Sequence, residues 1–107
     1  MLFAGVSHRD GALIEIQDYV LIGSGVHIYT SNHRFSDRSR EIYFQGHNSA
    51  EKVTIRTGAW IGAGSILLPG VEVGCNSVIG AGSIVTKNIP DFCIAVGNPA
   101  KVIKIMD

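Results

Sequence analysis

Aliphatic residues recur every six positions along residues 53–90 without interruption. The repeated positions are Ile55, Ile61, Leu67, Val73, Ile79 and Val85. A period of six differs both from the 3.6-residue period of a helix and from the alternation of a long strand. It is typical of a short strand and a turn repeated many times, because repeats of fixed length mark solenoids and β-helices.

Each six-residue repeat predicts one strand and one corner. A small or branched residue such as Ala59 precedes each aliphatic residue by two positions, so that Ala59 and Ile61 point inward while Trp60 points outward. The glycine that follows, such as Gly62, is expected to let the chain turn the corner. Three strands then close a triangular coil of eighteen residues. The expected stacks between coils are Ile55 over Val73, Ile61 over Ile79 and Leu67 over Val85.

The same rhythm organises the rest of the chain into one all-β domain over residues 1–107. It begins at Ile14, continues for about one coil, and breaks at Tyr29. Residues 34–52 have no rhythm and predict a loop that protrudes from one face of the coil. After Pro90 we expect a last strand and a short C-terminal cap over about residues 91–107. A β-sandwich is the alternative, but it gives no reason for the repeats to stay in phase.

Three motifs carry a resemblance to a known family. They are WIGAG at 60–64, VIGAGSIVTK at 78–87 and GNPAKVI at 97–103. They resemble the hexapeptide-repeat acyltransferases, and most of all the subgroup of maltose, galactoside and polysaccharide O-acetyltransferases. The resemblance covers about residues 14–104 and implies a left-handed parallel β-helix, whose handedness the spacing alone does not define.

The resemblance implies an enzyme that moves an acetyl group from acetyl-CoA to a hydroxyl or amine of a small acceptor, such as a sugar. The motif TSNH at 30–33 matches the place of the family's catalytic histidine, which assigns that role to His33. Imidazole, with a pKa near ~6.5, removes a hydroxyl proton around neutral pH. We expect direct transfer, because Cys75 and Cys93 lack a local signature of an activated nucleophile.

The resemblance also implies a set of residues for coenzyme A. They are Trp60, Ala63, Ala81, Thr86, Lys87 and Lys101. Small side chains such as Ala63 and Ala81 leave room for a pantetheine arm, and the two lysines suit phosphate groups. For the acceptor we expect contacts from three residues in or beside the loop. They are Asn32, Phe35 and Tyr43.

Composition excludes several classes of function. Nine basic and nine acidic residues give a net charge of zero, without the basic excess of a nucleic-acid-binding domain. No apolar run is long enough to span a membrane. The first residues lack the features of a signal peptide, which favours a cytoplasmic protein. Cys75 and Cys93 are one coil apart, but Pro90 is expected to break the register between them and leave both thiols free.

The outward positions of the repeats predict a homotrimer. They include Leu21, Trp60, Ile66, Val78 and Ile84, which form apolar flanks that mark an interface. A three-sided prism packs naturally around a threefold axis.

Three alternatives to a sugar acetyltransferase stay open. One is an antibiotic O-acetyltransferase of the same superfamily. Another is a non-catalytic trimer, because the segment before the repeats is short. The third resembles the γ-class carbonic anhydrases, with zinc on histidines such as His8, His27, His33 and His47. Zinc needs at least three converging ligands, and nothing in this spacing enforces that, so no metal is expected.

Overall fold

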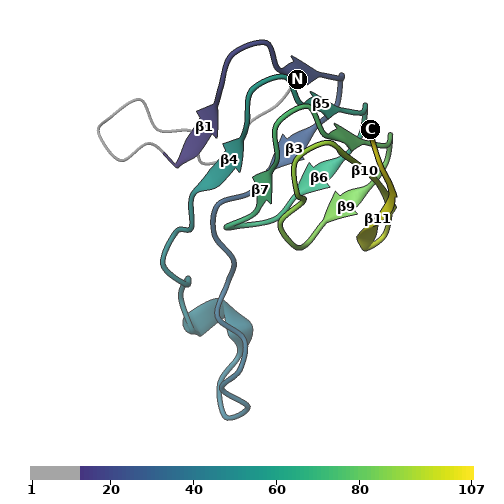
Figure 1. Cartoon of the computed structure of the whole chain (residues 1–107). Coiled ribbons are helices and arrows are strands. Elements are labelled where there is room, and N and C mark those ends of the chain that lie inside the picture. The colour runs from purple at the N-terminus through teal and green to yellow at the C-terminus, as the bar shows by residue number, and fades with distance from the viewer. Residues whose placement is uncertain (1–12) are drawn as a thin grey trace.

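The computed structural model describes residues 13–107, and the chain within this range winds as a coil of short strands (Figure 1). The candidate ligand His8 lies outside the described residues. The strands are β1 (Ile14–Ile16), β2 (Leu21–Ile22), β3 (His27–Ile28), β4 (Val53–Ile55), β5 (Trp60–Ile61), β6 (Ile66–Leu67), β7 (Glu72–Val73), β8 (Val78–Ile79), β9 (Ile84–Val85), β10 (Cys93–Gly97) and β11 (Ala100–Ile105).

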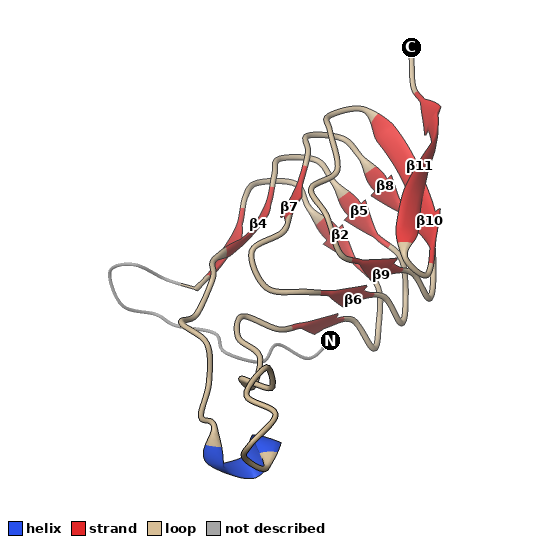
Figure 2. Ribbon diagram, turned by 90° about the horizontal axis from the view of Figure 1, so that it is seen from below, coloured by secondary structure: helices blue, strands red, loops and turns tan. Residues whose placement is uncertain are grey.

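Three sheets form the sides of the coil, and successive strands pass from one sheet to the next (Figure 2). Face A contains β1, β4 and β7, face B contains β2, β5, β8, β10 and β11, and face C contains β3, β6 and β9. Every pairing between coils is parallel. The fold is the predicted left-handed parallel β-helix.

The core is a stack of aliphatic side chains along the inside of the coil. The register pairs Ile55 with Val73, Ile61 with Ile79 and Leu67 with Val85, which confirms the predicted stacks. All six side chains are fully buried. Three serines also lie in this interior, at Ser65, Ser77 and Ser83. Their hydroxyls bond to the backbone, as buried polar groups must.

The glycines near the corners have two different roles. The role predicted for Gly62, turning the corner, belongs to a glycine at another position. Gly62 does not adopt a positive φ; a Cβ added there would meet backbone atoms of the next coil, with Ala81 N only 2.6 Å away. The turn is made two residues later by Gly64, whose φ is 73°. Asn76 makes the corresponding turn two repeats further on, with φ of 51°. Gly62 is therefore needed for close approach of the coils, and Gly64 for the corner.

The regular winding ends between Val85 and Ile89, slightly before Pro90, where the break was expected. Val73 pairs with Ile89 and Ile79 with Ala95, so this last coil has sixteen residues instead of eighteen. The shift separates Cys75 from Cys93, and both are free thiols. A turn with a cis peptide bond between Asn98 and Pro99 then leads into β11, which pairs antiparallel with β10 at the edge of face B.

The predicted loop leaves the coil after β3 and returns at β4, and it projects far from the body of the coil (Figures 1 and 2). It contains a single turn of 3-10 helix, η1 (Ile42–Phe44). No helix within residues 13–107 has the length and apolar character needed to cross a bilayer.

Candidate active site

The predicted catalytic residue, His33, lies at the base of the protruding loop, where the two strands of the loop meet. It forms a single antiparallel bridge with His47. Hydrogen bonds of 2.9 Å flank this bridge on both sides, from Arg34 N to Gly46 O and from Asn48 N to Asn32 O. The backbone that carries His33 is therefore fixed by pairing, although the residue lies outside the coil.

The two imidazole rings stack across this bridge. The centroids of the His33 and His47 rings are 4.4 Å apart, with an angle of 33° between the ring planes. Both residues are exposed to solvent. The arrangement leaves the ring of His33 accessible to a substrate, while the ring of His47 limits its motion on one side.

Side chains inside the loop hold its shape. The Gln45 amide accepts a bond from Asp37 N at 3.1 Å and donates to the carbonyls of Asp37 and Arg40, at 2.9 and 2.8 Å. The guanidinium of Arg40 donates to Phe44 O at 2.9 Å. These bonds tie the outgoing and returning strands of the loop together, so the protrusion is an organised structure.

The Asp37 carboxylate is engaged within its own turn. Its Oδ1 accepts bonds from the hydroxyl of Ser39 at 2.6 Å and from Ser39 N at 2.9 Å. The Ser39 hydroxyl, followed by its backbone N–H, lowers the pKa of Asp37 below its usual value, so this carboxylate is charged at neutral pH.

A hollow of about 350 Å³ opens inside the loop, and neither His33 nor His47 is among the residues that line it. Its lining is polar and consists of Arg34, Ser36, Asp37, Arg40, Gln45 and Asn48. Two of these residues, Arg34 and Asn48, are the chain neighbours of His33 and His47. The hollow and the candidate base therefore belong to one local structure.

The three residues expected to contact the acceptor lie along the loop at different distances from its base. Asn32 takes part in the backbone bonds beside the histidine pair. Phe35 is 68% exposed and follows this pair. Tyr43 is 87% exposed in η1, where its ring lies edge-on to Phe44. The loop therefore presents aromatic surface outward, away from its own coil.

The residues expected to bind coenzyme A fall into three groups in a single chain. Ala63 and Ala81 stack at the corner between faces B and C, where Gly82 N donates to Ala63 O at 2.9 Å. Thr86 and Lys87 follow β9 at the opposite end of face C, the end from which the loop of His33 also leaves. Face C therefore lies between the alanines and His33.

The third group lies on face B. Trp60 is 53% exposed on β5, and Lys101 lies on β11, opposite Val96. Two strands, β8 and β10, separate β5 from β11 in this sheet. One chain therefore does not bring Trp60 and Lys101 to the same place as His33.

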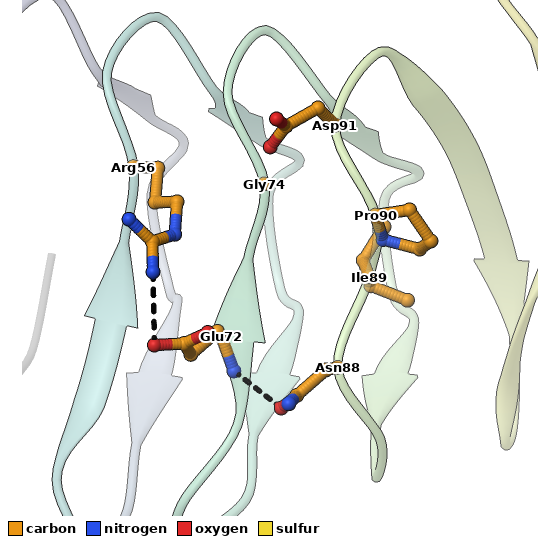
Figure 3. Close-up of a pocket in the computed structure, with 7 residues that line it drawn as sticks. All are labelled: Arg56, Glu72, Gly74, Asn88, Ile89, Pro90 and Asp91. Carbon is orange, nitrogen blue, oxygen red and sulfur yellow. Dashed lines mark hydrogen bonds and ion pairs between the residues drawn. The ribbon is translucent and has the colours of Figure 1, made fainter.

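Face A differs from the other two faces because ion pairs cover it. A second hollow lies on this face, away from the loop. The volume of that hollow is about 320 Å³, and Figure 3 shows its lining of Arg56, Glu72, Gly74, Asn88, Ile89, Pro90 and Asp91. Ion pairs cover this face, from Arg56 to Glu72 at 3.2 Å and from Lys52 to Glu15 at 2.6 Å.

The metal alternative finds no ligand set in the part of the chain that the structure describes. Residues 13–107 contain no group of three His, Cys, Asp or Glu side chains close enough to hold one ion. His27 is engaged with the Tyr29 hydroxyl, at 3.2 Å from its Nδ1.

Sequence reasoning considered His47 only as a possible zinc ligand, and it missed both the pairing of His47 with His33 and the polar lining of the loop. His47 lies fourteen residues beyond His33, and no spacing rule links the two positions. The turn at Asp37 could have been predicted from the sequence, because an Asp followed two residues later by Ser commonly forms a turn closed by a side-chain hydrogen bond.

The fold and the exposed histidine define a class, the β-helices built from hexapeptide repeats. The profile of the bacterial transferase hexapeptide family (six repeats) matches residues 52–87. A galactoside O-acetyltransferase of Lactococcus lactis is 45% identical over 93 residues, which is 87% of this chain and 44% of the relative.

Comparison with solved structures points to the same group of proteins. A maltose O-acetyltransferase from Clostridium difficile superimposes with a TM-score of 0.79 at 44% identity, over 88% of this chain and 49% of that one. A galactoside acetyltransferase in complex with coenzyme A gives a TM-score of 0.81 at 38% identity, over 92% of this chain and 48% of that one. The chain carries the repeats of the hexapeptide family and is similar to these acetyltransferases, of which it spans about half the length.

Proposed function

We propose that the protein transfers an acetyl group from acetyl-CoA to a hydroxyl group of a small acceptor, a sugar in the first place. The observation that carries the proposal is the superposition with a galactoside acetyltransferase that holds coenzyme A, over 92% of this chain. The relatives named above act on sugars rather than antibiotics, which favours a sugar acceptor over the antibiotic alternative.

His33 acts as the base in this proposal. Its imidazole takes the proton of the acceptor hydroxyl while the oxygen attacks the thioester carbonyl. The tetrahedral intermediate then collapses, the C–S bond breaks, and the imidazolium returns the proton to the leaving thiolate of coenzyme A. The exposed position of His33 supports this role, because acceptor and donor must both reach it.

The binding groove for coenzyme A lies between subunits of a trimer. Faces B and C carry apolar outward residues, including Leu21, Trp60 and Ile66, whereas face A is covered by ion pairs. Packing faces B and C around a threefold axis would bring Trp60 of one subunit toward the loop of another. This arrangement would reunite the groups that a single chain keeps apart.

We expect the protein to sediment as a trimer at micromolar concentration, because the apolar residues on faces B and C are costly to leave in water. Analytical ultracentrifugation measures this directly. Trp60→Glu places a charge on face B and is expected to shift the population toward monomer. Asn88→Asp is the matched control, because it adds a charge at an exposed position of face A and keeps the oxygen that accepts from Glu72 N. A wild-type monomer at this concentration contradicts the proposed groove.

We expect Lys101→Ala to weaken coenzyme A binding and to make the remaining affinity less dependent on salt. An exposed lysine–phosphate contact is screened by added ions, so removing it removes that part of the salt dependence. Turnover at saturating acetyl-CoA should change little. Titration calorimetry at two salt concentrations measures the effect, and Lys104→Ala, on the same strand, is the control. Unchanged affinity in Lys101→Ala contradicts the placement of the phosphate end.

The experiment that tests the function is a screen for acetyl-CoA consumption, with free thiol release as the readout. Acceptors should include galactosides, maltose, amino sugars and antibiotics of the streptogramin and chloramphenicol types. Transfer to a sugar hydroxyl supports the proposal. Transfer restricted to antibiotics contradicts the choice of acceptor, and binding of coenzyme A without transfer to any compound favours a non-catalytic trimer.

A further inference from the structure

The hollow inside the loop carries an excess of positive charge. Two guanidinium groups, of Arg34 and Arg40, and one carboxylate, of Asp37, line it. Neither arginine forms an ion pair within residues 13–107, where the ion pairs are Lys52 with Glu15 and Arg56 with Glu72. Asp37 directs its Oδ1 to Ser39 rather than to an arginine. The hollow therefore has one positive charge in excess and two arginines without a carboxylate partner.

One of these arginines is held in place before any ligand arrives. Arg40 donates from Nη2 to Phe44 O at 2.9 Å, and its own carbonyl accepts a bond from the Gln45 amide at 2.8 Å. A guanidinium has five N–H donors in a planar fork, so most donors of Arg40 stay available. Preorganised donors bind more tightly, because less conformational entropy is lost when the ligand arrives.

The chemistry of the lining selects an anion with planar or tetrahedral oxygens. Guanidinium groups bind carboxylate and phosphate through paired N–H···O bonds, which are stronger than bonds between neutral groups. Ser36 and Asn48 add a hydroxyl and an amide to the same wall. The volume of about 350 Å³ accommodates one charged group together with part of a sugar ring.

We propose that this hollow binds a phosphate or carboxylate group on the acceptor, and that the acceptor of the acetyl group is therefore an anionic sugar. The inference rests on the proposed acetyl transfer for its final step. Arg34 directly follows His33 in the chain, so an anion held by Arg34 and Arg40 would be bound by the same loop that carries the imidazole. Arg34 and Arg40 then determine specificity, while His33 does the chemistry.

Binding is tested first, without acetyl-CoA, so that the result does not depend on catalysis. Glucose 6-phosphate, glucuronate and glucose are titrated into the whole protein and followed by calorimetry. We expect at least one of the two anionic sugars to bind about tenfold or more tightly than glucose, and the phosphate and carboxylate arms identify which group is recognised. Equal binding of all three sugars would overturn the proposal.

Three substitutions in the loop separate charge from loop structure. Arg34→Gln should lose about tenfold or more in affinity for the anionic sugar, whereas Arg38→Gln, in the same loop but outside the hollow, should bind as the wild type does. Asp37→Asn keeps an oxygen for Ser39 and removes the negative charge, so it should bind the anion more tightly. Weaker binding in Asp37→Asn, or unchanged binding in Arg34→Gln, would overturn the proposal.

Turnover then distinguishes the two proposals. With the anionic sugar as acceptor, Arg34→Gln should raise KM by about the factor lost in binding and leave kcat within a few-fold, as expected for a residue that binds but does not react. Acetylation of neutral sugars with no preference for charge leaves the acetyl transfer standing and overturns the anionic acceptor. Anion binding without acetylation of the bound sugar overturns its assignment as the acceptor.

Discussion

His33→Ala is expected to lower the turnover number by about 10²–10⁴-fold, because the substitution removes the group that accepts the hydroxyl proton. Binding of coenzyme A should change little. The fold should also persist, because His33 lies outside the coil and contributes nothing to its buried core. The measurement is kcat with the acceptor found in the screen, together with calorimetry for coenzyme A and thermal unfolding.

His47→Phe is the matched control for this prediction. A phenyl ring can keep the stacking against the imidazole of His33, now at 4.4 Å between centroids, but has no nitrogen to accept a proton. Turnover within a few-fold of wild type in His47→Phe, together with a large loss in His33→Ala, assigns the base to His33. Wild-type turnover in His33→Ala would remove this residue from the mechanism, and the reverse pattern would assign the base to His47.

The coil could be predicted because the same packing of inward side chains repeats along it. Each inward aliphatic residue stacks on the residue eighteen positions later, so the period of the sequence predicts the pairing of Ile61 with Ile79. A slip by one residue would turn every inward side chain outward, which strongly disfavours other registers. A break of the register was also predicted, at Pro90, and the structure has it slightly earlier, between Val85 and Ile89.

The loop could not be predicted in the same way. Its shape depends on individual bonds between side chains and backbone, such as those of the Gln45 amide to Asp37 and Arg40. No period relates these residues, and each bond forms only when the others fix the backbone. The pairing of His33 with His47 follows from that backbone. The sequence therefore indicated His33 by resemblance but left its neighbours unknown.

The glycines show a different limit of sequence reasoning. Gly62 and Gly64 lie in the same motif, and composition alone gives both the same role. In three dimensions Gly62 lies against the next coil, with Ile79 O 2.7 Å from the place of a Cβ, whereas nothing lies within 4 Å of a Cβ at Gly64. One position excludes any side chain, and the other excludes only residues that resist a positive φ.

Substituting asparagine at each of these two glycines should therefore give opposite results. Gly62→Asn is expected to lower the free energy of unfolding by about 3 kcal/mol or more, because the new side chain must push apart two coils whose contact is made by rigid backbone.

Gly64→Asn should cost less than about 1 kcal/mol, since asparagine tolerates a positive φ. Asn76, at φ of 51°, already makes the same kind of turn two repeats further along the chain. Denaturant unfolding at one fixed protein concentration measures both changes, and circular dichroism checks that the coil is retained. Equal losses at the two positions would show that close packing of the coils does not explain Gly62.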